Sequence, residues 1–375
     1  MLLVPNLTDV APRLPTATVR VLRPEELDAP FLASWNALES RALAPNAFLS
    51  PNFVLPAVRH LTPHADVRIA AIEMFGTLCG LGVFELRGPT RALPVRHLAS
   101  YECIHSYAGS VLIDRECAST TLNALFRFLI QPGADWHAVQ ISKFPGDGPF
   151  FHSWNQHAPG LKWHESARVE RSILRPSAID ETYLRTHLQS RSKDCARLLR
   201  NLSKQGEVTW KYIPANEISD ANVERFLELE HMGWKAEGGT SLLSSASNAN
   251  FFREMISTFC QRGQAFLTEL HVNGEAIASI VNLTSGDAGF TFKVAWHADF
   301  ARYAPGILNE FEFMRHAAEH CSALDYIDSG AEPGSYIDGL WRDRRTLISG
   351  VYPTSALGEK AVRTVSMFKR FIGKP

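Results

Sequence analysis

Two stretches of the chain share one order of apolar runs, turns and glycines, 198 residues apart. Residues 68–88 and 266–286 each hold an alternating or apolar run, a turn, a second apolar run and a closing glycine. The same offset relates Asn52–Phe53 to Asn250–Phe251, and each pair opens a segment with helical spacing. A fixed offset that links two unlike elements predicts a duplicated chain.

The second copy has the clearer pattern of strands and helices. Asn273-Gly274 predicts a hairpin turn, because both residues tolerate a positive φ. Pro305 suits the first turn of a helix, since its missing N–H would be unpaired there anyway. The expected strands are 206–215, three antiparallel strands within 264–296, 323–330 and 345–353, and the expected helices are 216–234, 248–263, 306–320 and 356–373.

The first copy follows the same order of elements. A linker over about 158–180 and a basic helix over 184–206 are expected to join the two copies. The expected elements of the first copy are a strand at 18–24, helices at about 25–40 and 51–62, a hairpin at 67–86, a helix at about 119–132 and a strand at 135–144. The predicted division is a tail over 1–17, a first domain over 18–165, a linker with a bridging helix over 166–207 and a second domain over 208–375.

Composition adds limits to this division. The 375 residues are 45% hydrophobic and 21% charged, which is ordinary for a globular chain of about two domains. The formal net charge of −1 gives no global field that would favour nucleic acid or an acidic membrane. The six cysteines never fall at Cys-x-x-Cys spacing, so we expect no metal or redox site. The chain has neither a signal-peptide pattern nor an apolar run long enough to span a bilayer, so we expect a cytoplasmic protein.

Four segments of the second copy resemble the GNAT superfamily of acyl-CoA-dependent N-acyltransferases. They are 190–208, 226–242, 292–308 and 325–341. The duplication resembles the tandem branch, which includes a bacterial cellulose-biosynthesis-associated acetyltransferase-like family and, more distantly, Fem-type aminoacyltransferases. The resemblance implies an α/β (α+β) fold of two tandem GNAT-like domains, each a mostly antiparallel twisted sheet flanked by helices. The second domain would be catalytic and the first non-catalytic.

The resemblance also implies where an acyl-CoA co-substrate would bind. In the family a bulge splays the sheet after the fourth strand, the thioester enters the gap, and the next helix offers N–H groups to the pyrophosphate. A typical phosphate loop has two spaced glycines, of which Gly306 alone remains here, and Ile337 stands where relatives often have lysine. The expected donor-binding residues are Lys293, Val294, Ala295, Tyr303, Pro305, Gly306, Ile307 and Leu308.

Amine acylation needs a base for the ammonium proton and a proton source for the leaving thiolate. Glu230 and His231 end a helix near the expected acceptor, Asp328 ends the fifth strand, and Tyr303 and Tyr336 are candidate acids. Glu230 and His231 have an ordinary alternative as a solvated helix end, and Tyr303 and Tyr336 have one as packed rings. The expected substrate-binding residues are Trp234, Lys235, His297, Trp341 and Arg342.

The leading hypothesis is therefore an N-acyltransferase that moves an acyl group from a CoA-type thioester to the amine of a small molecule or biosynthetic intermediate by direct attack. One alternative keeps the fold but takes aminoacyl-tRNA as donor, held by the basic helix, which is otherwise a solvated connection. The other alternative is a non-catalytic GNAT-fold binding protein. The candidate tRNA contacts are Arg191, Lys193, Arg197 and Arg200.

Overall fold

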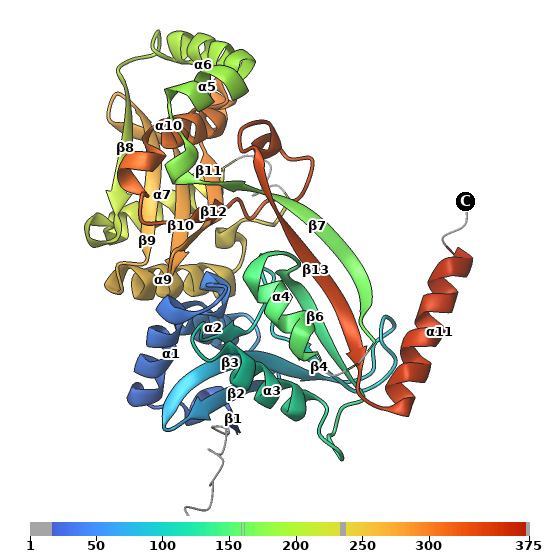
Figure 1. Ribbon diagram of the computed structural model, residues 1–375. Coiled ribbons are helices and arrows are strands. Elements are labelled where there is room, and N and C mark those ends of the chain that lie inside the picture. The colour runs from blue at the N-terminus through green and yellow to red at the C-terminus, as the bar shows by residue number, and fades with distance from the viewer. Residues whose placement is uncertain (1–16, 159, 161, 233–237, 373–375) are drawn as a thin grey trace, which may run out of the picture.

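The computed structural model describes residues 17–372 except 159, 161 and 233–237 (Figure 1). In the first half, the helices are α1 (Ala29–Arg41), α2 (Pro51–His60), α3 (Ala118–Leu129) and α4 (Gly148–His157). The strands of this half are β1 (Thr18–Leu22), β2 (Val67–Met74), β3 (Thr77–Arg87), β4 (His97–Ser100), β5 (Leu112–Ile113) and β6 (Ala138–Pro145).

The rest of the chain builds a second, larger set of elements. Its strands are β7 (His164–Leu174), β8 (Val208–Pro214), β9 (Ala265–Val272), β10 (Glu275–Ser285), β11 (Ala288–Trp296), β12 (Tyr326–Asp328) and β13 (Asp343–Pro353). Its α-helices are α5 (Glu181–His187), α6 (Gln189–Leu202), α7 (Asp220–Glu230), α9 (Ala246–Gln261), α10 (Pro305–His320) and α11 (Ala356–Ile372). Two short 3-10 helices matter for the site. Helix η6 (Ala298–Tyr303) directly precedes α10, and helix η7 (Tyr336–Gly339) follows β12.

The structure confirms the predicted duplication. Strands β2 and β3 coincide with β9 and β10, end for end, at the offset of 198 residues. The turns between them match as well, since Phe75-Gly76 and Asn273-Gly274 all adopt positive φ. These are the two-residue turns whose twist fits the right-handed twist of the flanking strands.

One sheet joins the strands of both halves, in the order β1-β2-β3-β4-β6-β13-β7-β12-β11-β10-β9-β8. The halves exchange a strand at its centre. Strand β7 follows β6 in sequence but pairs with β12 of the second half, whereas β13 follows β12 and pairs with β6 of the first half. The two exchanged strands also pair with each other, as the long adjacent arrows of Figure 1 show.

Strand β7 was expected to be part of a linker. Its residues 164–171 are mostly charged or small, and most of them are exposed, so the sequence lacks the apolar pattern of a buried strand. The helix expected over 184–206 is divided into α5 and α6 at Leu188, whose side chain is fully buried. The domain limits stay a prediction, with β13 pairing across the expected boundary.

The sheet carries helices on both faces. Helices α1, α2, α7 and α9 share a single hydrophobic core with one face of both halves. On the other face, α3 and α4 cover the first half and α6 and α10 cover the second. Adjacent residues of one strand enter different cores, as Phe266 and Leu267 of β9 do. Within the described part of the chain, no helix combines the length and the apolar character that a membrane crossing requires.

Candidate functional site

A gap opens in the sheet of the second half between β11 and β12. The two strands pair in parallel only from Ala288 with Tyr326 to Phe290 with Asp328, and β11 then continues to Trp296. On its other side β11 pairs Thr291 with Asn282 and Lys293 with Val281, so Phe292 is an extra residue in the ladder. This bulge bends β11 away from β12. The resemblance implied a bulge after the fourth strand of the second copy, and the observed bulge lies within that strand.

A pocket of about 260 Å³ lies beside this gap, where α10 begins. Its lining residues are Val294, Trp296, Ala301, Ala304, Pro305, Gly306, Ile307 and Tyr336. Ala304 precedes the helix in the left-handed conformation (φ 51°, ψ 54°) and supplies no side-chain cap. The N–H groups of the first helical turn therefore face an apolar wall without a capping side chain, which suits an anionic ligand.

Four of the expected donor-binding residues, Val294, Pro305, Gly306 and Ile307, line this pocket. Lys293 and Ala295 do not, because neighbouring residues of a strand face opposite sides, and Ala295 packs in the core with α7 and α9. Tyr303 is also away from the pocket. Its ring packs in the core under α10, and its hydroxyl accepts a hydrogen bond from Arg302 at 2.6 Å.

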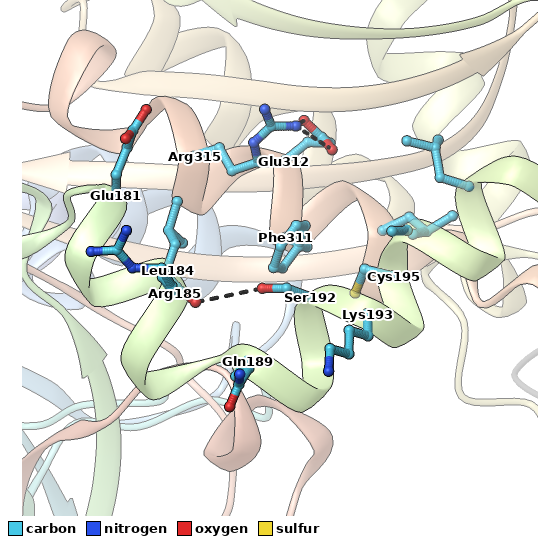
Figure 2. A pocket seen from close by; sticks show the side chains of 13 residues that line it. Glu181, Leu184, Arg185, Gln189, Ser192, Lys193, Cys195, Phe311, Glu312 and Arg315 are labelled. Carbon is cyan, nitrogen blue, oxygen red and sulfur yellow. Dashed lines mark hydrogen bonds and ion pairs between the residues drawn. The ribbon is translucent and has the colours of Figure 1, made fainter.

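A larger pocket of about 530 Å³ lies on the outer side of α10, between that helix and α5 and α6 (Figure 2). Leu308, which was expected at the donor, is one of its lining residues. Phe311 lies near the middle of the view in Figure 2, with Cys195 to its right, Lys193 below Cys195, and Arg185 on the left. The pocket combines apolar side chains with charged ones of both signs, which are Arg185, Lys193, Arg315, Glu181 and Glu312.

The four basic residues of the bridging helix do not act as one group. Lys193 lines the larger pocket. Arg191 lies against the backbone of Gly339, where an added Cβ would come within 2.9 Å of its guanidinium. Arg197 is exposed and its guanidinium lies 3.6 Å from the carboxylate of Asp194. Arg200 is exposed on the same side of α6 as Lys193 and Arg197, as their spacing of four and three residues requires.

Glu230 and His231, at the C-terminal end of α7, contact residues 241 and 242. The Glu230 carboxylate is buried and accepts the N–H of Leu242 at 2.7 Å. His231 Nδ1 lies 2.7 Å from the hydroxyl of Ser241. Both contacts position backbone on the face of the sheet opposite the smaller pocket. The expected acceptor residues Trp234 and Lys235 lie outside the described residues.

Asp328 is the centre of a buried ion cluster. Its carboxylate lies 3.6 Å from Arg171 of β7 and 3.2 Å from Arg345 of β13, and it accepts the N–H of Gly330 at 2.9 Å. Asp328 and Arg171 are 1% and 2% exposed. The two exchanged strands thus deliver the arginines that neutralise it. These contacts hold the Asp328 carboxylate where the pairing of β11 with β12 ends, and its catalytic role stays a prediction.

The remaining expected substrate contacts lie elsewhere. Trp341 is fully buried in the core under α10. His297 uses Nδ1 to accept the N–H of Asp299 and so caps η6. The backbone N–H of Arg342 donates to the Tyr183 hydroxyl at 3.4 Å.

The first half contributes a segment that the sequence analysis does not identify. Residues 105–110 occupy the place between β4 and β6 that corresponds to the gap of the second half. Gly109 donates its N–H to the carbonyl of Lys143 at 2.9 Å, and a Cβ at Gly109 would lie 1.9 Å from the carbonyl of Ser142. Strand β4 is correspondingly short, with four residues against nine in β11.

The same segment reaches across to the second half. The ring of His105 stacks on Phe251, and the ring of Tyr107 lies 5.8 Å from that of Phe292 at the bulge. Burial, and then the positive charge of Lys293, lowers the pKa of His105 to about 4. His105 is therefore neutral at physiological pH, with Nε2 3.2 Å from the side-chain oxygen of Asn248.

Comparisons with known proteins agree with this architecture. Residues 189–336 match the model of the acetyltransferase (GNAT) domain. Similar solved structures include FemX, with 11% identity, 95% of this chain and 100% of that chain covered and a TM-score of 0.58. A C-terminal domain (DUF2156) assigned to a lysylphosphatidylglycerol synthetase from Agrobacterium fabrum has 12% identity, 90% and 95% coverage and a TM-score of 0.57.

A conserved protein of unknown function from Bacteroides thetaiotaomicron is similar at 12% identity, with 86% of this chain and 97% of that chain covered and a TM-score of 0.58. At such identities these likenesses concern the fold. No curated protein sequence matches the chain. Residues 189–336 are thus similar to the acetyltransferase (GNAT) domain, and the chain as a whole shares its fold with these solved structures.

Proposed function

We propose that the chain is an N-acyltransferase whose second repeat holds an acyl thioester of the CoA type. The observation that carries the proposal is the coincidence of three features at one place. They are the bulge at Phe292, the gap between β11 and β12, and the pocket against the uncapped first turn of α10. The acyl arm would enter the gap, and the phosphates would lie at the helix.

The reaction would be direct attack of an amine on the thioester carbonyl. A C–N bond forms and the C–S bond breaks, the amine loses its extra proton, and the leaving thiolate takes up a proton. Tyr336 lines the pocket and is our candidate for that last proton transfer. Although 42% of its surface is exposed, burial and then the charge of Glu310 raise the pKa of Tyr336, so its phenol stays protonated at neutral pH.

We assign the acceptor to the opposite face of the gap, where both repeats meet. Lys293 and the His105–Tyr107 segment lie there. The first repeat would not take a donor, because its own segment 105–110 occupies the corresponding gap. It would instead form one wall of the acceptor site. The duplicated chain would then have one donor-binding gap, which is the gap of the second repeat.

An aminoacyl-tRNA donor remains the second candidate on this fold. The observation that favours it is the exposed row Lys193, Arg197 and Arg200 on α6, of which Lys193 also lines the larger pocket. Such a row attracts a phosphate backbone without regard to sequence, and its binding would weaken as salt is added. Figure 2 shows the side chain of Lys193 extending from α6.

Calorimetric titration with acetyl-CoA, CoA and longer acyl-CoAs tests the main proposal. Saturable binding that Gly306→Val abolishes supports it, and no binding of any of these at millimolar concentration overturns it. For the second candidate, tRNA binding is compared between the wild type and Lys193→Glu/Arg197→Glu/Arg200→Glu. The control is Arg127→Glu/Lys360→Glu/Arg363→Glu, which changes the net charge equally on α3 and α11. Equal tRNA affinity of the two triple variants would exclude α6 as the contact. Turnover of any donor eliminates a purely non-catalytic binding protein.

A further inference from the structure

The far end of α10 carries three metal-ligating side chains on one helical face. His316, Glu319 and His320 occupy positions i, i+3 and i+4, which lie next to one another on a helix. One ligand atom from each, two ring nitrogens and a carboxylate oxygen, all lie within 4.8 Å of one another. His316 Nδ1 is 3.3 Å from a carboxylate oxygen of Glu319. The three groups already converge on one point.

Aromatic residues of the neighbouring strand β8 hold both imidazole rings. His316 stacks on Trp210, with ring centroids 4.9 Å apart and planes 13° apart. His320 stacks on Tyr212 at 4.3 Å and 2°. Stacking covers the faces of the rings and leaves their edges, where the nitrogens are, for other contacts. Side chains that are ordered in advance lose less entropy when they bind a ligand.

The two supporting rings are themselves fixed. Trp210 donates its indole N–H to Asn309 of α10 at 2.9 Å. Tyr212 stacks on its other side against Phe266 of β9, with centroids 5.1 Å apart. Partners that orient a histidine ring are a regular feature of metal sites in proteins, although there they commonly act through the second ring nitrogen. Here the orientation comes from ring stacking on the edge strand of the sheet.

We propose that His316, Glu319 and His320 bind a first-row transition metal ion, with Zn²⁺ as the first candidate. Imidazole nitrogens suit zinc, nickel and copper, whereas magnesium and calcium prefer all-oxygen sites. Three protein ligands leave at least one position of a tetrahedral zinc ion for water or an outside ligand. The side chains of His316 and Glu319 are 40% and 68% exposed, so an ion reaches them from solvent.

The site is separate from the donor pocket. It lies at the C-terminal end of α10, where the helix dipole favours a cation, whereas the pocket lies at the N-terminal end. A helix of 16 residues is about 24 Å long, so a bound ion would not touch the donor. The expected consequence is a firmer last turn of α10 against β8. The expectation of no metal rested on cysteine spacing, which gives no indication of a His-x-x-Glu-His pattern.

The test uses the full chain without a histidine tag. Zn²⁺ is titrated against a chromophoric chelator, and Co²⁺ binding is followed by its visible absorption. We expect one equivalent to bind, and His316→Ala/His320→Ala to lower the affinity by more than about 100-fold, since even losing an outer partner of a metal ligand costs 10–100-fold. The control His64→Ala removes an exposed histidine elsewhere and should bind as the wild type does.

A second variant distinguishes the loss of metal ligands from a folding defect. His316→Phe/His320→Phe keeps an aromatic ring on Trp210 and Tyr212 but has no ligand nitrogen, so it should fold and fail to bind. Far-UV circular dichroism checks the fold of each variant. The proposal is overturned if the wild type binds neither ion at millimolar concentration, or if either double variant binds as tightly as the wild type.

Discussion

Phe53 and Phe251, which are related by the repeat offset of 198 residues, contact each other across the two halves. Their rings meet edge to face, with centroids 5.4 Å apart and planes 84° apart, and both side chains are fully buried. Equivalent residues of two repeats can touch in this way only close to a local two-fold axis. Helices α2 and α9, which carry them, therefore form a pseudo-symmetric interface that resembles an internal dimer.

The first prediction concerns this pair. Phe53→Ala and Phe251→Ala should each lower the free energy of unfolding by about 3–5 kcal/mol, the usual cost of removing a buried phenylalanine. The double variant should lose less than the two single losses added together, by about 0.5–1.5 kcal/mol, because the ring–ring contact is removed only once. Urea denaturation measures all three. Strict additivity would show that the rings are not energetically coupled.

The second prediction follows from the buried, neutral His105. Its folded pKa of about 4 lies below the ordinary value of 6.5, so the unfolded chain binds the proton more readily. The resulting stability is fully present above pH 6.5 and is lost as the pH falls toward 4. The size of the effect is on the order of 3 kcal/mol at most.

Urea denaturation of the wild type and His105→Gln between pH 7.5 and about pH 4 measures this effect as a difference. We expect the wild type to lose stability relative to the variant as the pH falls. His105→Gln should also raise the KM for the amine more than that for the thioester, since His105 lies on the proposed acceptor side. Parallel unfolding curves at every pH would contradict the assigned pKa.

The third prediction separates donor binding from folding. A Cβ at Gly306 would lie 3.5 Å from Trp296 and 3.7 Å from Val294, which is ordinary contact, and φ at this position is not positive. Gly306→Ala should therefore fold and gain up to about 1 kcal/mol in helix propensity. The methyl group narrows the pocket, so the donor Kd should rise several-fold. Gly88→Ala, where a Cβ meets nothing within 4 Å, is the control for both measurements.

Most helices and strands of the fold could be predicted from local patterns in the sequence. The hairpins at 67–86 and 265–285 follow from alternation and turn residues, and helix α10 follows from Pro305 and its apolar spacing. The exchange of β7 and β13 could not be predicted in this way, because pairing between distant strands leaves no local pattern in either of them. Residues 164–171 even have the polar character of a linker.

The same distinction between local patterns and distant contacts applies to the candidate site. Pro305 and Gly306 were predicted because a helix start has a local chemistry. The environment of Asp328 depends on Arg171 and Arg345, which lie 157 and 17 residues away in the chain. His105 reaches the site because its segment of the first repeat packs against the second repeat. The sequence around His105 does not indicate this contact. Contacts between repeats decide which residues surround the gap.

The fourth prediction concerns Glu39, which joins the halves from a fully buried position. Its carboxylate accepts hydrogen bonds from Ser50 at 2.9 Å and from Ser285 at 2.8 Å. Burial raises the pKa of Glu39 to about 7, against the ordinary 4.5, although the two hydroxyl groups oppose the shift. The stability that the proton confers is fully present below pH 4.5 and is lost as the pH rises through 7.

Glu39→Gln removes this titration and keeps the shape of the side chain. The variant should match the wild type near pH 4.5 and exceed its stability at pH 8 by an amount on the order of 3 kcal/mol. Thermal or urea unfolding at the two pH values measures the difference. A variant that is less stable than the wild type at pH 8 would mean that Glu39 is ionised and well compensated in the folded protein.

The fifth prediction uses the two equivalent hairpin turns as controls for each other. Phe75 adopts φ 52° with 87% of its surface exposed, and Asn273 adopts φ 51° at the same place in the second repeat. A left-handed conformation costs most residues about 1–2 kcal/mol, and asparagine tolerates it best after glycine. Phe75→Asn should therefore raise the free energy of unfolding by up to about 1 kcal/mol, because no packing is lost.

The reverse substitution, Asn273→Phe, should change the free energy of unfolding by more than Phe75→Asn does. Asn273 also accepts the N–H of Glu207 at 2.9 Å and donates to the carbonyl of Gln205 at 3.4 Å, which fastens the start of β8 to the turn. Asn273→Phe loses these bonds in addition to the conformational preference, so we expect a cost of about 1–3 kcal/mol. Urea midpoints of the two single variants and of the swapped pair test this. Equal and opposite effects would mean that the side chain of Asn273 stabilises the turn alone and contributes nothing to β8.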